Sequence, residues 1–159
     1  MWIFVMVIRE QGLSLVEMMV TVAVAGILAL YGGSLTSRWL GKQKLQAAEE
    51  MLQQGYAKAR AVALSNGAVS GVNGSSLLVL TNKQICVHNS DHSAVDCSDA
   101  LWHAELPVDS ATIANQQTTC IAFNSAGLPA SGTLGTTNCT QSTQYSMSKG
   151  SDDANGYLE

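Results

Sequence analysis

The order of apolar and polar positions divides the chain into an apolar helical part, an amphipathic helical part and a β-rich part. From Leu13 to Tyr31 the only charged residue is Glu17. At about 1.5 Å per residue, such a helix nearly spans a hydrocarbon core of roughly 30 Å. Residues 13–34 are therefore predicted to form a transmembrane helix segment. A cleaved secretory signal is the alternative, but the apolar run continues into a further helix, which favours a retained segment.

Residues 35–66 are predicted to form an amphipathic helix. Apolar residues recur there at steps of three and four, which marks one buried face. The positions are Leu45, Ala48, Leu52, Gly55/Tyr56, Ala59 and Val62/Ala63. Asn66-Gly67 is a typical helix end. We expect this face to pack against a β-sheet of the same chain.

Residues 67–159 form short apolar runs between turn residues, which predicts a β-rich globular domain. The expected strands are Ser76–Thr81, Gln84–His88, Leu101–Leu106, Thr118–Asn124 and Gln144–Met147. The first two flank Asn82-Lys83 and predict a β-hairpin. A long helix followed by antiparallel strands gives the α+β class.

Charge excludes some function classes. The apolar content of 47 % is too high for a disordered chain, and a net charge of −4 does not suit a protein that coats nucleic acid. After Arg60 the only basic residues are Lys83 and Lys149, whereas most acidic residues lie there. No nucleophile elbow, P-loop, H-E-x-x-H or dinucleotide motif is present. We therefore expect no enzymatic activity and no cofactor.

Glu17 is the main candidate functional residue. A carboxylate within an apolar helix costs several kcal/mol unless it finds a partner. It either reaches the membrane interface or pairs with a cation of another subunit. Its spacing from Gly12 and Leu13 matters, since cleavage after Gly12 would make Glu17 the fifth residue of the mature chain.

The stretch GLSLVEMMVTVAVAGIL resembles the N-terminus of type IV pilins and pseudopilins. The resemblance implies that residues 1–12 are a prepilin leader, that prepilin peptidase cleaves between Gly12 and Leu13, and that Leu13 is N-methylated. It also implies that Glu17 docks the incoming subunit during assembly. The leader begins at Met1, or at Met6 if translation starts there.

The segment CIAFNSAGLPASG is similar to the FimT/FimU/GspH subgroup. This implies a minor pilin in the inner membrane, with a single pass and a periplasmic C-terminal domain, later incorporated in a filament. Its partners would be other minor and major pilins, prepilin peptidase, the inner-membrane assembly platform and membrane lipid. The alternatives are a GspH-like minor pseudopilin of a type II secretion system and a DNA-uptake pilin. DNA binding fits poorly, because phosphate contacts need clustered Lys and Arg.

The four cysteines permit three disulfide pairings. If the domain is exported, its thiols oxidise, and sequential pairing of Cys86 with Cys97 and of Cys120 with Cys139 is the simplest expectation. A zinc site of Cys86, His88, His92 and Cys97 is the rival. The spacing between its cysteines is too long for a typical structural zinc site, so we expect no metal. Asp152, Asp153 and Asn155 offer too few ligands for calcium, and a solvated tail is expected there.

Overall fold

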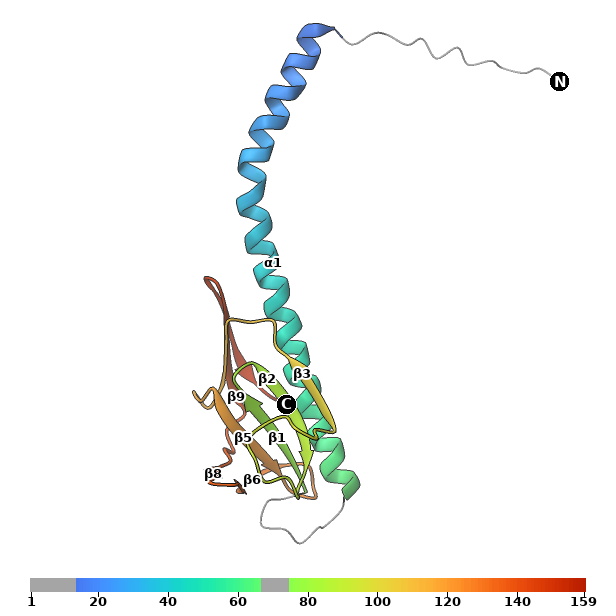
Figure 1. Cartoon of the computed structure of the whole chain (residues 1–159), viewed down its shortest axis with the longest axis vertical. Coiled ribbons are helices and arrows are strands. Elements are labelled where there is room, and N and C mark those ends of the chain that lie inside the picture. Colours follow the sequence, from blue (N-terminus) through green and yellow to red (C-terminus); the bar gives the residue numbers. More distant parts are fainter. Residues whose placement is uncertain (1–13, 67–74) are drawn as a thin grey trace, which may run out of the picture. The chain divides into compact units, whose positions relative to one another are not determined.

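The computed structural model describes residues 14–66 and 75–159, and of residues 30–38 only the helical backbone (Figure 1). The chain divides into two compact units, one up to Arg38 and one from Trp39 to Glu159. A single helix, α1 (Leu15–Asn66), belongs to both units. The predicted leader and Leu13 lie outside the described residues, as does the start of the β-rich region, residues 67–74.

In the first unit, the described residues of α1 are exposed on every side. The large apolar side chains from Leu15 to Leu28 have between 50 % and 77 % of their surface accessible. No helix in the described part of the chain is long and apolar enough to cross a membrane. The predicted segment, residues 13–34, extends beyond the residues whose side chains are described.

In the second unit, α1 is amphipathic as predicted. The buried positions are Leu45, Ala48, Leu52, Gly55, Tyr56, Ala59 and Ala63. They lie at helical steps on one face, which packs against the strands of this unit, so the expected packing is confirmed. The helix end is fixed by Asn66, whose Nδ2 donates to the carbonyl of Ser75 at 3.0 Å and to Asn89 Oδ1 at 3.2 Å.

A five-stranded antiparallel sheet lies against the helix, in the order β3-β2-β1-β5-β6. Its strands are β1 (Ser76–Thr81), β2 (Gln84–Asn89), β3 (Trp102–Glu105), β5 (Thr118–Phe123) and β6 (Pro129–Ala130). The predicted hairpin is confirmed, because β1 and β2 pair from Thr81↔Gln84 outward. Asn82 takes a positive φ of 57° in this turn, a conformation that asparagine tolerates well.

The remaining strands form two smaller sheets, and they include elements that the sequence did not predict. One sheet has the order β10-β9-β4, made of β4 (Ser110–Ile113), β9 (Gln144–Lys149) and β10 (Asp152–Tyr157). The other pairs β7 (Thr133–Leu134) with β8 (Thr137–Asn138). The expectation that Asp152, Asp153 and Asn155 lie in a solvated tail is therefore wrong. Residues 152–157 pair with β9 along their whole length, so backbone pairing outweighs their low strand propensity.

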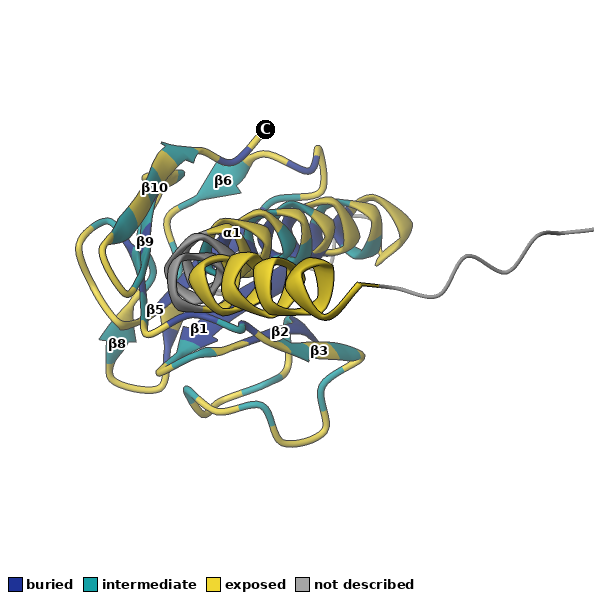
Figure 2. Cartoon of the chain, turned by 90° about the horizontal axis from the view of Figure 1, so that it is seen from above, coloured by how far each residue is buried: buried dark blue, intermediate teal, exposed yellow. Residues whose placement is uncertain are grey.

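The main sheet has a buried core on each face, because alternate residues of a strand point to opposite sides. Leu78 and Leu80 of β1 join the core beneath the helix, which also takes in residues of β4 and β9. Leu77 and Val79 join a smaller core with Cys86, Cys120 and other residues on the opposite face. Figure 2 shows β1 as a buried strand in dark blue. A helix followed by antiparallel strands confirms the α+β class.

Candidate functional site

Glu17 lies in the first described turn of α1. An acidic side chain is favourable there, because the helix macrodipole is positive at its N-terminal end. The side chain is exposed, and it has no hydrogen bond or ion pair with any described residue. The structure therefore gives this carboxylate a favourable place on the helix but no charged partner within the described chain.

The surface around Glu17 is apolar on all sides of the helix. Leu15, Val16 and Met19 are 77 %, 67 % and 67 % exposed. A helix that is apolar all round is stable only in lipid or among other apolar helices. The nearby hydroxyl of Thr21 is satisfied locally, since it donates to the carbonyl of Met18 at 3.0 Å. Glu17 is thus the side chain in this stretch that still needs a polar partner.

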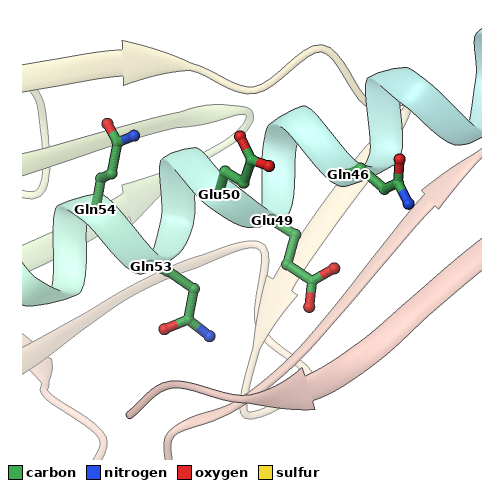
Figure 3. A pocket seen from close by; sticks show the side chains of 5 residues that line it. All are labelled: Gln46, Glu49, Glu50, Gln53 and Gln54. Carbon is green, nitrogen blue, oxygen red and sulfur yellow. The ribbon is translucent and has the colours of Figure 1, made fainter.

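The second unit presents a polar face on the same helix. Gln46, Glu49, Glu50, Gln53 and Gln54 line a shallow groove there (Figure 3). Figure 3 shows Glu49 and Gln53 on one side of the helix and Glu50 and Gln54 on the other. The groove holds two carboxylates and three amides, and its two carboxylates lie on different sides of the helix.

Glu49 and Gln53 connect this face to the C-terminal strands. The hydroxyl of Tyr145, on β9, donates to Glu49 Oε1. Burial, together with this hydrogen bond, raises the pKa of Tyr145 to about 12. Gln53 Nε2 donates to the carbonyl of Tyr157 at 3.2 Å, and the amide of Glu159 approaches Gln53 Oε1 at 3.5 Å. These two side chains therefore hold the C-terminal hairpin to the helix.

The cysteines form two disulfides in the sequential pairing, Cys86–Cys97 and Cys120–Cys139. The sulfur atoms of Cys86 and Cys97 are therefore bonded to each other and do not act as zinc thiolates. No group of three or more His, Cys, Asp or Glu residues is arranged to hold a metal in the ranges 14–66 and 75–159.

The histidines of the rival zinc site form a stacked pair. The rings of His88 and His92 are parallel, with centroids 3.7 Å apart and an interplanar angle of 9°. The nitrogen lone pairs of two stacked rings do not converge on one ion. His88 Nε2 lies 3.0 Å from the carbonyl oxygen of Asp96, and His92 Nε2 lies 3.4 Å from Asp96 Oδ1. Burial, followed by the neighbouring His92, lowers the pKa of His88.

The C-terminal acids do not form a calcium site either. Asp152 and Asp153 are consecutive residues of β10, so their side chains point to opposite faces of the strand. Asp109, on the neighbouring loop, binds elsewhere: its carboxylate accepts from Lys149 Nζ at 2.7 Å and from the amide of Gly150 at 2.8 Å. These bonds lower the pKa of Asp109.

The sequence expectations for the processing site lie outside the described residues, since Gly12 and Leu13 precede Ser14. The contacts of Glu49 and Gln53 were not predicted. Each joins residues about a hundred positions apart in the chain. In the sequence, Glu49 and Gln53 are polar residues beside the buried face of the helix. This position alone does not identify the residues that they bind.

Comparison with known proteins gives one match. Residues 5–31 match the prokaryotic N-terminal methylation motif, which includes Gly12, Leu13 and Glu17. No curated protein and no solved structure is significantly similar to the chain. The methylation motif, followed by an α+β domain with a long N-terminal helix, supports a type IV pilin-like or pseudopilin protein.

Proposed function

We propose that this protein is a non-catalytic minor pilin of the FimT/FimU/GspH type. It is inserted in the inner membrane with its C-terminal domain in the periplasm, and it then enters or primes a filament of pilins. One observation carries the proposal. Glu17 is the fifth residue after the predicted cleavage site, and it has no partner among the described residues in a part of the helix that is apolar on all sides.

The physical role of Glu17 follows from its surroundings. An ionised carboxylate in an apolar environment is stable when a cation neutralises it. Cleavage after Gly12 creates an α-amino group at Leu13, and each subunit of an assembly carries one. The pairing of Glu17 with the amino terminus of a neighbouring subunit would therefore fix the axial position of the incoming helix.

The second unit supplies a rigid head for such a subunit. Its helix face is buried against its own sheet, and two disulfides link strands and loops. The part of this unit after Arg60 does not favour DNA uptake. After Arg60 the basic residues are Lys83 and Lys149, and Lys149 is already paired with Asp109. A minor pseudopilin of a type II secretion system has the same requirements as a minor pilin, and the assembly partners decide between them.

The test combines N-terminal mass spectrometry with co-purification from membranes. The mature protein should begin with an N-methylated Leu13. Glu17→Ala and Glu17→Gln should both be processed and inserted, but their co-purification with partner pilins should fall at least about tenfold, because a lost buried charge pair costs several kcal/mol. Thr21→Val is the matched control, since it removes a polar group from the same helix and should assemble normally.

Two results would contradict the proposal. A mature N-terminus other than Leu13 removes its basis. Wild-type co-purification of both Glu17 variants shows that the carboxylate only reaches the membrane interface. The identity of the co-purified partners, as pilus or secretion-system subunits, separates the minor pilin from the minor pseudopilin.

A further inference from the structure

The first turns of the second unit carry exposed side chains that the domain does not use. Trp39 has 60 % of its surface exposed and Leu40 45 %. Lys42 and Lys44 are exposed as well. The buried face of the helix begins only at Leu45. We call residues 39–44 the Trp39–Lys44 segment.

The two lysines of this segment form no ion pair with the residues that the structure describes. Lys42 shares a groove with Asp152 and Asp153, yet no carboxylate of the described chain lies within ion-pair distance of Lys42 or Lys44. Both ammonium groups are therefore available to an anion outside the chain.

Charge along the helix is concentrated at this position. Between Glu17 and Glu49 the only charged residues are Arg38, Lys42 and Lys44, and all three are basic. The chain after Arg60 has the opposite sign, with most of the acidic residues. An anionic surface would attract the segment and repel the rest of the domain, which gives the interaction a direction.

The arrangement of apolar and basic side chains identifies the kind of surface. Trp39 and Lys42 are three residues apart, and Leu40 and Lys44 four apart, so each apolar side chain has a lysine as its helical neighbour. Lysine is depleted at protein–protein interfaces. Tryptophan beside lysine is instead typical of the membrane interface, where an amphipathic ring lies at the level of the headgroups.

We propose that the Trp39–Lys44 segment binds anionic lipid headgroups at the surface of the membrane that holds the apolar helix. The inference rests on the proposed function, because it requires the helix to be inserted. Only four residues separate the predicted membrane segment, which ends at residue 34, from Trp39. Binding of the segment would hold the acidic domain at a defined height above the membrane before assembly.

The experiment uses the full chain in nanodiscs. Trp2→Phe and Trp102→Phe leave Trp39 as the only tryptophan. The discs contain phosphatidylcholine alone or mixed with phosphatidylglycerol, and a phospholipid brominated near its headgroup serves as the quencher. Trp39 emission should be shifted to the blue and quenched, more strongly in the anionic discs.

Charge variants separate the segment from general electrostatics. Each lysine near an anionic surface favours the bound state by about fivefold. Lys42→Gln/Lys44→Gln should therefore abolish the extra quenching in anionic discs. Lys58→Gln/Lys83→Gln removes the same charge from the domain and should leave the quenching unchanged. Equal effects of the two double variants would overturn the assignment to this segment.

The outcomes also distinguish the inference from the function on which it rests. A chain that enters the discs but keeps an unquenched, water-like Trp39 overturns the inference alone. A chain that does not enter the discs contradicts membrane insertion, and with it both proposals.

Discussion

Gly156 lies where no larger residue fits, and its replacement by alanine tests the packing of the C-terminal hairpin. Gly156 of β10 pairs directly with Tyr145 of β9. A Cβ at this position would lie 2.5 Å from Tyr145 Oη, 2.8 Å from Cζ and 2.9 Å from Cε1. Tyr145 is only 2 % exposed, so its ring has little room to move. The variant must therefore displace either the strand or the ring.

The expected cost can be worked out from opposing effects. Overpacking of a buried site costs about 1–3 kcal/mol, and three atoms closer than normal contact place this site at the upper end. Replacement of glycine by alanine lowers the entropy of the unfolded chain, which returns about 0.4–1 kcal/mol. Gly156→Ala should therefore lower the free energy of unfolding by about 2 kcal/mol.

The assay is a urea titration of residues 39–159 with the disulfides intact, in which unfolding is monitored by circular dichroism. With a slope of about 1–3 kcal/mol per molar urea, the midpoint should fall by roughly 1 M. Gly41→Ala is the matched control. Its Cβ would make an ordinary contact of 3.4 Å with Asp152 Oδ2, and alanine is the better helix former. The control should therefore be as stable as the wild type or more stable.

Tyr145→Phe turns the prediction into a double-mutant cycle. The phenylalanine lacks the hydroxyl that binds Glu49, which should cost about 1.5–3 kcal/mol because that bond is made to a carboxylate. It also removes the oxygen nearest to the new Cβ. Gly156→Ala should therefore cost less in the Tyr145→Phe background than in the wild type. An unchanged midpoint for Gly156→Ala, or equal costs in both backgrounds, would refute the packing argument.

Three further predictions concern other parts of the second unit. Leu52→Ala, beneath the sheet at 1 % exposure, should lower the free energy of unfolding by about 2–5 kcal/mol in urea titrations, and a smaller loss would contradict the helix–sheet core. Cys120→Ala/Cys139→Ala should lower the free energy of unfolding by about 2–4 kcal/mol. A wild-type protein that is equally stable with its disulfides reduced would contradict this prediction. The folded-state pKa of Asp109 is depressed, so its contribution is present above the unfolded-state pKa and is lost as pH falls through the folded value. Lys149→Gln should move the carboxyl titration of Asp109, followed by NMR, upward toward its usual range.

The helix and the hairpin of β1 and β2 could be predicted because their signals are local. The face from Leu45 to Ala63 repeats at steps of three and four, and the strands around Asn82-Lys83 are apolar runs beside a turn. The register of β1 with β2 follows from the two-residue loop, which fixes which residues lie opposite. Each of these inferences needs only neighbouring residues.

The C-terminal hairpin was missed because its signal is weak in the residues themselves. Asp152–Tyr157 contains aspartates, asparagine and glycine, which are depleted in strands. The two-residue loop Gly150-Ser151 was the available sign, and Gly150 indeed has a positive φ of 62°. Pairing with β9 supplies the stability that the strand lacks alone.

The candidate site was interpreted from spacing along the chain. The spacing of Gly12, Leu13 and Glu17 predicts processing and docking, and residues 5–31 match the methylation motif. The roles of the single residues stay predictions. The contact of Glu49 with Tyr145 could not be anticipated, because many residues on both elements were equally plausible partners. The stacked pair of His88 and His92 is similar, since its geometry depends on how the loop after β2 is closed by the disulfide.

The two parts of helix α1 differ in how their apolar surface is covered, and the proposed function rests on this difference. From Leu45 to Ala63 the apolar side chains form one face, and strands of the same chain cover it. From Leu15 to Leu28 the apolar side chains surround the helix, and no described residue covers them. Burial of this surface is strongly favourable, and the described residues do not provide it. Under the proposed function, Glu17 favours a helix assembly over lipid alone, because a carboxylate in an apolar environment is stabilised by a neighbouring cation. Under the proposed function, the first unit therefore makes the contacts of assembly, whereas the folded domain determines what is carried into the filament.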